Sequence, residues 1–259
     1  MSDIHRRQKE LKGWDQSVIS ELTCLVLGIG GYGTNISSNL CRLGVKKIIL
    51  VDMDVVEEHN LNRQILFRKE HIGRPKVHCA LEELERHNNV SGTVIESYDM
   101  DALKNWQLTL KLIQESDVIF NSIDHGDYFD LVICKIAEKY KIPIVLGGTE
   151  PFYGHTVSYF LQGVYSDDPK YWDCHDLTKI GIMDCQVEQI ESFDDLLFLP
   201  KDSHPTVGGS TVYSAATGSH LMTSAMINYL HHLKNPERPN PPKQVIFNLL
   251  TMESTFWFN

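Results

Sequence analysis

Glycines gather in one short segment, Gly28-Ile29-Gly30-Gly31-Tyr32-Gly33, between an apolar run and a helical pattern. Glycine lets the backbone turn tightly and approach a phosphate closely, and the amino end of the following helix offers N–H groups and partial positive charge. Asp52 follows nineteen residues after Gly33, where a carboxylate can accept hydrogen bonds from a ribose. The pattern predicts a nucleotide site that includes Gly28, Gly30, Gly31, Gly33 and Asp52. The alternative is a tight turn with no ligand.

A dense set of polar and charged residues follows Asp52. A dinucleotide's pyrophosphate is held mainly by backbone amides, whereas a reacting triphosphate needs Arg and Lys charge and a carboxylate-bound Mg²⁺. The set therefore favours ATP over NAD, and an NAD(P)-dependent oxidoreductase stays a distant alternative. The sequence contains no Gly-x-x-x-x-Gly-Lys-Ser/Thr motif, which excludes the P-loop NTPases. The residues of the set are Asp54, Asn60, Arg63, Gln64 and Lys76.

Alternating strands and helices are expected to position these residues, because strands separated by helices of ten to fifteen residues indicate parallel βαβ crossovers. Strands are predicted over Thr23–Leu27, Lys46–Asp52, Thr93–Tyr98, Asp117–Ile123, Pro143–Gly147 and His155–Leu161. Helices are predicted over Gly31–Leu43, Pro75–Asn88, Met100–Gln114, Asp127–Tyr140 and Gly208–Leu233.

The expected fold is α/β, a Rossmann-like doubly wound and mostly parallel sheet with an N-terminal helix, a long crossover loop and a C-terminal antiparallel hairpin. The hairpin is expected at Val245–Leu250 and Ser254–Phe258. A single domain over residues 1–259 is predicted, with an N-terminal helical arm (1–22) and a loop insertion (165–205) that has no sustained period.

Composition bounds the class of partner. The 259 residues include 24 Lys and Arg against 34 Asp and Glu, a net charge of −10. This charge disfavours nucleic acid and anionic membranes, since both attract basic surfaces. No apolar run approaches the ~20 residues of a membrane helix, and the charged start of the chain does not look like a secretory signal. Six cysteines without a Cys-x-x-Cys pair fit a reducing compartment, so a cytoplasmic protein is expected.

Several motifs, in matching order, resemble those of one family: the adenylation domain of ubiquitin-activating enzymes and its bacterial relatives MoeB, ThiF and HesA. The resemblance covers nearly the whole chain and is weakest in the 165–205 segment. It rests on Arg6-Arg7-Gln8, Gly28–Gly33, Asp52-x-Asp54, Asn60-Leu61-Asn62-Arg63-Gln64, Lys76, Ser122-Ile123-Asp124 and Ile142–Gly148.

The resemblance implies an ATP- and Mg²⁺-dependent adenylation of a C-terminal glycine carboxylate, with release of pyrophosphate. The implied substrate is a ubiquitin-like or sulfur-carrier protein that ends in Gly-Gly. Because a carboxylate is already nucleophilic, such a site must align the reactants and neutralise phosphate charge, and it needs no general base.

The resemblance also assigns roles to single residues. Asp124 is the expected Mg²⁺ ligand, with helix capping as the alternative. Arg63 and Lys76 are expected to contact the β- and γ-phosphates, the alternative being solvated surface charge. Asn60 and Gln64 would orient Mg²⁺ or phosphate oxygens, although Asn60 could instead cap a turn.

Two further carboxylates and an arginine complete the implied site. Asp52 would accept from ribose hydroxyls, and Asp54 would be a structural carboxylate behind it. Arg7 resembles the arginine that dimers of the family send into the partner's site, where such a charge is worth roughly 10³–10⁵ in phosphoryl-transfer rate. A homodimer is therefore expected, and an exposed residue on a first helix is the alternative for Arg7.

The sequence departs from the family pattern at its cysteines. Many relatives carry two Cys-x-x-Cys pairs for a structural zinc, and none is present here. Cys24, Cys41, Cys79 and Cys134 fall in predicted core elements, where a thiol is usually a small buried hydrophobe. Cys174 and Cys185 are the candidates for a thioester, although neighbouring carboxylates disfavour a thiolate.

Another departure follows Asp124, where the family commonly has Asn and then Arg. Here His125, Gly126 and Phe129 stand instead, which leaves recognition of the acyl end open. Two related functions remain as alternatives: an ATP-dependent dehydratase of threonylcarbamoyladenosine in tRNA, and a non-catalytic half of a heterodimeric activating enzyme. The tRNA function alone would bring in nucleic acid, which the net charge disfavours.

Overall fold

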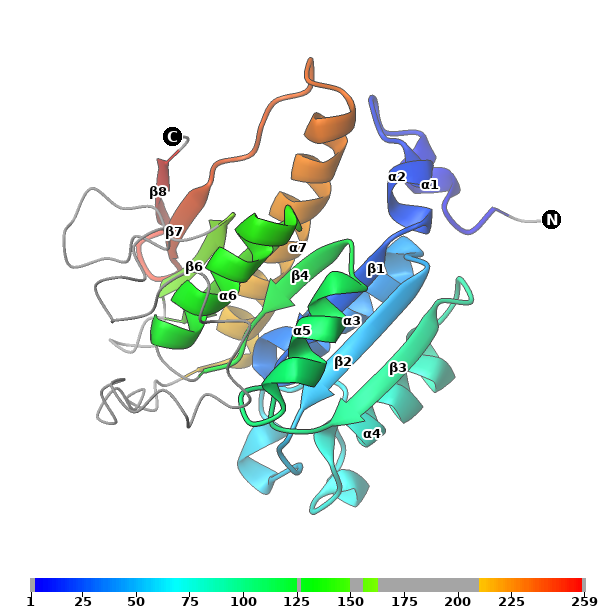
Figure 1. Ribbon diagram of the computed structural model, residues 1–259, viewed down its shortest axis with the longest axis vertical. Coiled ribbons are helices and arrows are strands. Elements are labelled where there is room, and N and C mark those ends of the chain that lie inside the picture. The colour runs from blue at the N-terminus through cyan, green and yellow to red at the C-terminus, as the bar shows by residue number, and fades with distance from the viewer. Residues whose placement is uncertain (1–2, 125–126, 150–155, 163–209, 258–259) are drawn as a thin grey trace.

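An eight-stranded sheet runs through the middle of the computed structural model, which describes residues 3–124, 127–149, 156–162 and 210–257 (Figure 1). Its strand order is β3-β2-β1-β4-β5-β6-β7-β8. The strands are β1 (Thr23–Leu27), β2 (Lys47–Asp52), β3 (Val94–Asp99), β4 (Val118–Asn121), β5 (Ile144–Thr149), β6 (Thr156–Leu161), β7 (Gln244–Asn248) and β8 (Glu253–Trp257).

The first five strands are parallel and the last three are antiparallel. The order 3-2-1-4-5 places a change of winding direction between β1 and β4. Open sheets of this kind bind ligands outside the carboxyl ends of the strands at such a point. The arrangement confirms the predicted α/β fold with its C-terminal antiparallel hairpin.

Helices cover both faces of the sheet. In Figure 1, α5 and α6 lie in front of the strands, and α3, α4 and α7 lie behind them. The α-helices are α1 (Arg6–Lys9), α2 (Gln16–Ser20), α3 (Gly31–Leu43), α4 (Lys76–Glu83), α5 (Trp106–Gln114), α6 (Asp127–Tyr140) and α7 (Val212–Lys234). Shorter turns are the 3₁₀ helices η1 (Glu58–Asn60) and η2 (Lys69–His71) and the π-helical turn η3 (Leu84–Asn88).

Each face of the sheet has its own apolar core, because side chains along a strand point alternately to opposite faces. In β1, Cys24 and Val26 pack toward α3 and α7, whereas Leu25 and Leu27 pack toward α5 and α6. A strand buried on both faces reads as a continuous apolar run, which is why β1 and β2 were evident from sequence. The core cysteines are buried as expected (Cys24, Cys41, Cys79 and Cys134).

Two predicted helices differ from the structure. The helix predicted from Met100 begins only at Trp106, because the Asp101 carboxylate accepts from the backbone N–H groups of Leu103 and Lys104 and holds them in a turn. The helix predicted over Pro75–Asn88 is α-helical to Glu83 and continues as the π-helical turn η3. The predicted insertion over 165–205 lies outside the described residues.

The N-terminal arm packs at the amino ends of the strands. The Asp15 backbone N–H donates to His231 Nε2 at 3.1 Å, and the Lys234 ammonium lies 2.7 Å from the Asp15 carboxylate. Both contacts are made by the last turns of α7. None of the helices in the described segments has the length and apolarity that a membrane crossing needs.

Helices α3 and α7 cross closely where Gly218 faces Tyr32. A Cβ atom at Gly218 would collide with the Tyr32 ring, whose hydroxyl donates to the Gly148 carbonyl at 2.7 Å. The missing side chain thus lets a tyrosine of the glycine turn reach the end of β5.

We therefore expect Gly218→Ala to lower the free energy of unfolding by about 1–3 kcal/mol through overpacking, despite alanine's higher helix propensity. Thermal or urea unfolding measures the change. The double variant Gly218→Ala/Tyr32→Ala should be more stable than the sum of the two single changes predicts, since the ring that collides is gone. Strict additivity would contradict this account.

Candidate functional site

The glycine turn lies at the carboxyl ends of β1 and β4, and two of its glycines are required by packing. Gly28 has φ +84°, a left-handed conformation that favours glycine. A Cβ there would lie 2.8 Å from the Ser122 carbonyl oxygen, and a Cβ at Gly33 would collide with the Gly28 carbonyl. Gly30 differs, because within the described residues a Cβ there would meet only Gln64 Nε2, at 3.8 Å. None of those residues therefore fills the space beside Gly30, which leaves room for a ligand.

Helix α3 begins at this open space. Gly30 is its N-cap residue and makes no side-chain cap hydrogen bond, so no side chain of the cap covers the first-turn N–H groups. The thirteen residues of α3 align their peptide dipoles toward that end. The turn can therefore receive an anion such as a phosphate.

The Asp52 carboxylate connects the glycine turn to the segment after β2. Its Oδ2 accepts from the Ile29 N–H at 2.6 Å, and its Oδ1 accepts from the Asp54 N–H at 2.8 Å. Burial raises the pKa of Asp52, an effect that the nearby positive charge of Lys76 opposes. Each oxygen keeps a second lone pair, so the carboxylate can also accept from a ligand hydroxyl.

Lys76 is a buried ammonium group beside this carboxylate. Its side chain is 8% exposed, and Nζ donates to Asp54 Oδ2 at 2.7 Å. The Lys76 backbone N–H also donates to the Asp54 carbonyl. Asp54 therefore places the lysine, as a structural carboxylate would, while its own side chain remains half-exposed.

Gln64 and Arg63 lie over the start of α3. Gln64 is buried, its Nε2 faces Gly30, and its Oε1 has no hydrogen-bond partner among the described residues. Arg63 Cγ lies 3.6 Å from the place of a Cβ at Gly31. Its Nη1 donates to the His59 carbonyl and to Asn62 Oδ1, and the guanidinium has five N–H donors in all. Both side chains thus face the open space at the turn.

Asn60 is used within its own turn. Its Oδ1 accepts from the Glu57 backbone N–H at 3.0 Å, and its Nδ2 lies 3.1 Å from His59 Nε2. The structure therefore shows the turn-capping contact that was the alternative for this residue. Its capping orders the segment that leads into Arg63 and Gln64.

Asp124 follows the end of β4, which packs directly on the glycine turn. Ser122 Oγ donates to the carbonyls of Leu27 and Gly28, and the Asn121 side chain accepts from the Ile123 N–H. Asp124 lies two residues after Ser122 and is exposed. The predicted residues Arg63, Lys76 and Asp124 are thus all brought to the carboxyl edge of β1, β2 and β4.

Arg7 is placed elsewhere. It lies exposed on α1, near the amino ends of the strands and at the opposite edge of the sheet from the glycine turn (Figure 1). Cys174 and Cys185, the thioester candidates, and His125 and Gly126 lie outside the described residues.

A cavity of about 390 Å³ also lies at that opposite edge, between α6, α7 and the start of β7. It contains none of the predicted site residues. The candidate nucleotide site is therefore distinguished by its hydrogen-bond donors and its exposed backbone, and not by the volume of a cavity.

A protein-family model described as the ThiF family matches residues 5–258, almost the whole chain. The chain belongs to the ThiF family. This confirms the resemblance read from the motifs.

Curated relatives of this ThiF-family chain match about half of it. The SUMO-activating enzyme subunit uba-2 of Caenorhabditis elegans is 28% identical over 141 residues, covering 54% of this chain and 23% of the relative. The NEDD8-activating enzyme E1 catalytic subunit of Arabidopsis thaliana is 32% identical over 143 residues, covering 51% and 30%. The chain thus spans about a fifth to a third of the length of the curated relatives it matches.

Solved structures share the fold of this ThiF-family chain over nearly its full length. A structure of Escherichia coli MccB with ATP has a TM-score of 0.67 at 19% identity, covering 94% of this chain and 65% of that one. A structure of the same protein with MccA-N7isoASN has a TM-score of 0.71 at 18% identity, covering 100% and 72%. At these identities the likeness concerns the fold alone.

Two contacts of the site were not anticipated from sequence. Tyr32 ties the glycine turn to the end of β5, and Ser122 ties it to β4. An aromatic residue inside a glycine motif and a hydroxyl two residues before Asp124 were the available signals. Neither residue type predicts its hydrogen-bond partner, because the partners are backbone carbonyls that lie far away in the sequence.

The Asp54–Lys76 pair gives an asymmetric prediction. Asp54→Ala leaves a buried ammonium short of an acceptor and should cost roughly 1–3 kcal/mol of unfolding free energy. Lys76→Met keeps the apolar stem, leaves Asp54 half-exposed to water and leaves Asp52 its two backbone donors, so it should cost less. Chemical denaturation of both variants measures the difference, and an equal or reversed order would contradict the proposed placement of the charge.

Proposed function

We propose that this protein adenylates a carboxylate with ATP and releases pyrophosphate. The observation that carries the proposal is the hydrogen-bonded series from Ile29 through Asp52 and Asp54 to Lys76. This series fixes a buried cation beside the open start of α3. A site that only held a dinucleotide pyrophosphate through backbone amides would not need that charge.

The surrounding residues support a triphosphate. The stem of Arg63 lies against Gly31 and brings a guanidinium to this side of the turn, and the amide of Gln64 faces Gly30. Charge near the β- and γ-phosphates stabilises the pyrophosphate as it leaves. The solved structure of MccB with ATP supports the choice of ATP for this fold.

In the proposed reaction a carboxylate oxygen attacks the α-phosphorus of ATP, the bond to the bridging oxygen of the β-phosphate breaks, and pyrophosphate leaves with its electron pair. The products are an acyl-adenylate and pyrophosphate, and no proton is transferred. Lys76 and Arg63 would neutralise the charge that grows on the leaving group. Asp52 would orient the ribose, and α3 would hold phosphate oxygens by its first N–H groups.

The oxygen-bearing side chains at the carboxyl ends of the strands are of the kind that binds Mg²⁺. Asp124 offers a carboxylate, and Gln64 Oε1 is a buried acceptor with no partner among the described residues, which suits a cation or its bound water better than a phosphate oxygen. Hard cations such as Mg²⁺ take oxygen ligands and keep several waters. When bound, the ion would shield the phosphates from each other's charge and from that of the attacking carboxylate.

The substrate that we propose is the C-terminal Gly-Gly end of a ubiquitin-like or sulfur-carrier protein. The names of the relatives, activating enzymes of SUMO, ubiquitin and NEDD8, support it. The net charge of −10 supports a protein acceptor over tRNA, since tRNA requires a basic face.

The first prediction of this function concerns Asp124. Purified protein with ATP, Mg²⁺ and a small protein ending in Gly-Gly should catalyse exchange of labelled pyrophosphate into ATP. Asp124→Asn should lower exchange at least about a hundredfold, because it removes the charge that holds Mg²⁺ at the phosphates. The control Glu115→Gln, at an exposed carboxylate after α5, should keep the wild-type rate.

Circular dichroism should show the same unfolding midpoint for Asp124→Asn and wild type. Undiminished exchange in Asp124→Asn would remove this residue from the mechanism. Exchange that depends on tRNA and not on the Gly-Gly protein would contradict the proposed substrate.

The second prediction concerns Arg7, which we propose to act in the site of a second copy of the chain. Arg7→Ala and Asp124→Asn proteins should each be inactive alone. When mixed, each mixed dimer would contain one site with native Asp124 and native Arg7, so exchange should reappear. Absence of recovery, with subunit exchange verified by differently tagged chains, would contradict action in trans.

A further inference from the structure

The segment between β2 and α4 closes on itself. The Lys76 N–H donates to the Asp54 carbonyl at 2.9 Å, the Val56 N–H to the Arg74 carbonyl at 2.9 Å, and the Gly73 N–H to the Val56 carbonyl at 2.8 Å. We call residues 54–76 the 54–76 loop. It contains Arg63 and Gln64, and its position decides where these two side chains stand relative to the glycine turn.

Two buried charged side chains on one face of helix α4 bind this loop. Lys76 and Glu83 are seven residues apart, about two helical turns, so their side chains lie on the same side of α4. Both are buried, with relative exposures of 6% and 4%. Lys76 holds the start of the loop through Asp54, and Glu83 holds its far arm through Arg68.

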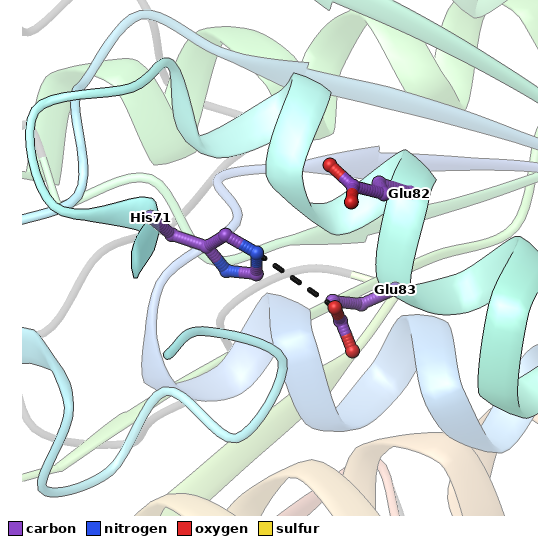
Figure 2. A group of neighbouring side chains, drawn as sticks. All are labelled: His71, Glu82 and Glu83. Atoms are coloured by element: carbon purple, nitrogen blue, oxygen red, sulfur yellow. Dashed lines mark ion pairs between the residues drawn. The ribbon is translucent and has the colours of Figure 1, made fainter. Parts of the chain in front are cut away.

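Arg68, His71 and Glu83 form a closed cluster, in which the histidine and the glutamate face each other across the gap between η2 and α4 (Figure 2). Arg68 Nη2 lies 2.6 Å from Glu83 Oε2. His71 Nδ1 accepts from the Arg68 backbone N–H at 3.2 Å, and its Nε2 faces Glu83 Oε1 at 3.7 Å. The carboxylate thus holds Arg68 through one oxygen, while its other oxygen faces His71 beyond hydrogen-bond distance.

The same corner resembles a metal site, because ligand atoms of His71, Glu82 and Glu83 lie within 4.8 Å of one another. The hydrogen bonds argue against a metal. Since Nδ1 accepts a backbone N–H, the proton of neutral His71 is on Nε2, the atom that would have to bind the ion. Glu82 is already paired with Arg74 at 2.8 Å and with Arg86 at 2.9 Å.

We infer that Glu83 is a positioning residue for ATP binding: through Arg68 it fixes the 54–76 loop so that Arg63 and Gln64 face the start of α3. The inference rests on the proposed function for its ligand. The connection is short, because the Phe67 N–H donates to the Gln64 carbonyl and the buried Phe67 directly precedes Arg68.

The expected effect is on affinity. If only a fraction of molecules holds the loop in place, the apparent Kd rises by the reciprocal of that fraction, while saturating ATP restores the ordered state. A variant that loosens the loop should therefore raise the Kd and KM for ATP and leave kcat nearly unchanged.

The test compares Glu83→Gln with Glu85→Gln, a change at an exposed carboxylate of η3. Glutamine at position 83 removes the charge of the buried carboxylate that pairs with Arg68 at 2.6 Å. We expect Glu83→Gln to raise the Kd of a fluorescent ATP analogue and the KM for ATP roughly tenfold, with kcat for pyrophosphate exchange within about twofold of wild type. Glu85→Gln should match wild type in all three.

Hydrogen exchange of the nucleotide-free proteins tests the loop apart from the function. Backbone N–H groups of Arg63, Gln64 and Phe67 are bonded within the loop, and their exchange should speed up in Glu83→Gln while β1, β2 and β4 stay protected. Equal loss of protection in the sheet would overturn positioning in favour of a global effect. If hydrogen exchange in the loop is faster in Glu83→Gln but even the wild type binds no ATP, the positioning of the loop by Glu83 would be upheld. The proposed function would then be refuted.

Arg68→Lys serves if Glu83→Gln does not fold, because Arg68 is half-exposed. It keeps the charge but loses the forked donors, so its Kd for the analogue should be roughly threefold above that of wild type; an unchanged Kd would overturn the inference. Zn²⁺ alone should leave the melting temperature of the wild type unchanged. A Zn²⁺-dependent rise that both Glu82→Gln and Glu83→Gln abolish would show a metal site instead.

Discussion

The site depends on one partly buried carboxylate, that of Asp52. Its two oxygens accept hydrogen bonds from the N–H of Ile29 in the glycine turn and from the N–H of Asp54 after β2. The carboxylate therefore joins the glycine turn to the segment after β2 at the carboxyl ends of the strands. Because these are charge-assisted hydrogen bonds, they are stronger than bonds between neutral groups. Without this link, neither the turn that faces the ligand nor the residue that holds Lys76 would have a fixed position.

Such a carboxylate is expensive to bury, and the raised pKa of Asp52 reflects that cost. The cost is offset locally by two backbone donors and the charge of Lys76, and not by the apolar core. Buried charges that are paired and hydrogen-bonded are tolerated, whereas removal of one partner is strongly destabilising. Lys76 and Glu83, the buried charges of α4, follow this rule, since each is matched by a residue of the 54–76 loop.

The glycine turn, the early strands and the candidate residues of the carboxyl edge could be predicted because their signals are local. Gly28 and Gly33 are required by contacts that any strand-to-helix turn of this kind makes, and β1 and β2 contain the continuous apolar runs Cys24–Leu27 and Ile48–Val51. The start of α5 could not be predicted, because the Asp101 side chain competes with the helix for backbone N–H groups. The cluster of Arg68, His71 and Glu83 was also missed, since fifteen residues separate its ends and no periodicity connects an arginine in a loop to a glutamate in a helix.

Helix α7 sets the distance between the two edges of the sheet. Near its start, Gly218 packs on Tyr32 of the glycine turn, and near its end, His231 binds the backbone of Asp15 in the N-terminal arm. Thirteen residues of helix separate these contacts, roughly 20 Å at 1.5 Å per residue. Since α7 is a continuous helix anchored at both points, residues before Asp15 could approach the glycine turn of their own chain only by giving up α1 and the Gln8–Gln16 hydrogen bond. With the arm folded as it is, a role for Arg7 at a nucleotide requires a second polypeptide, and the surface that would bring it there includes the arm itself.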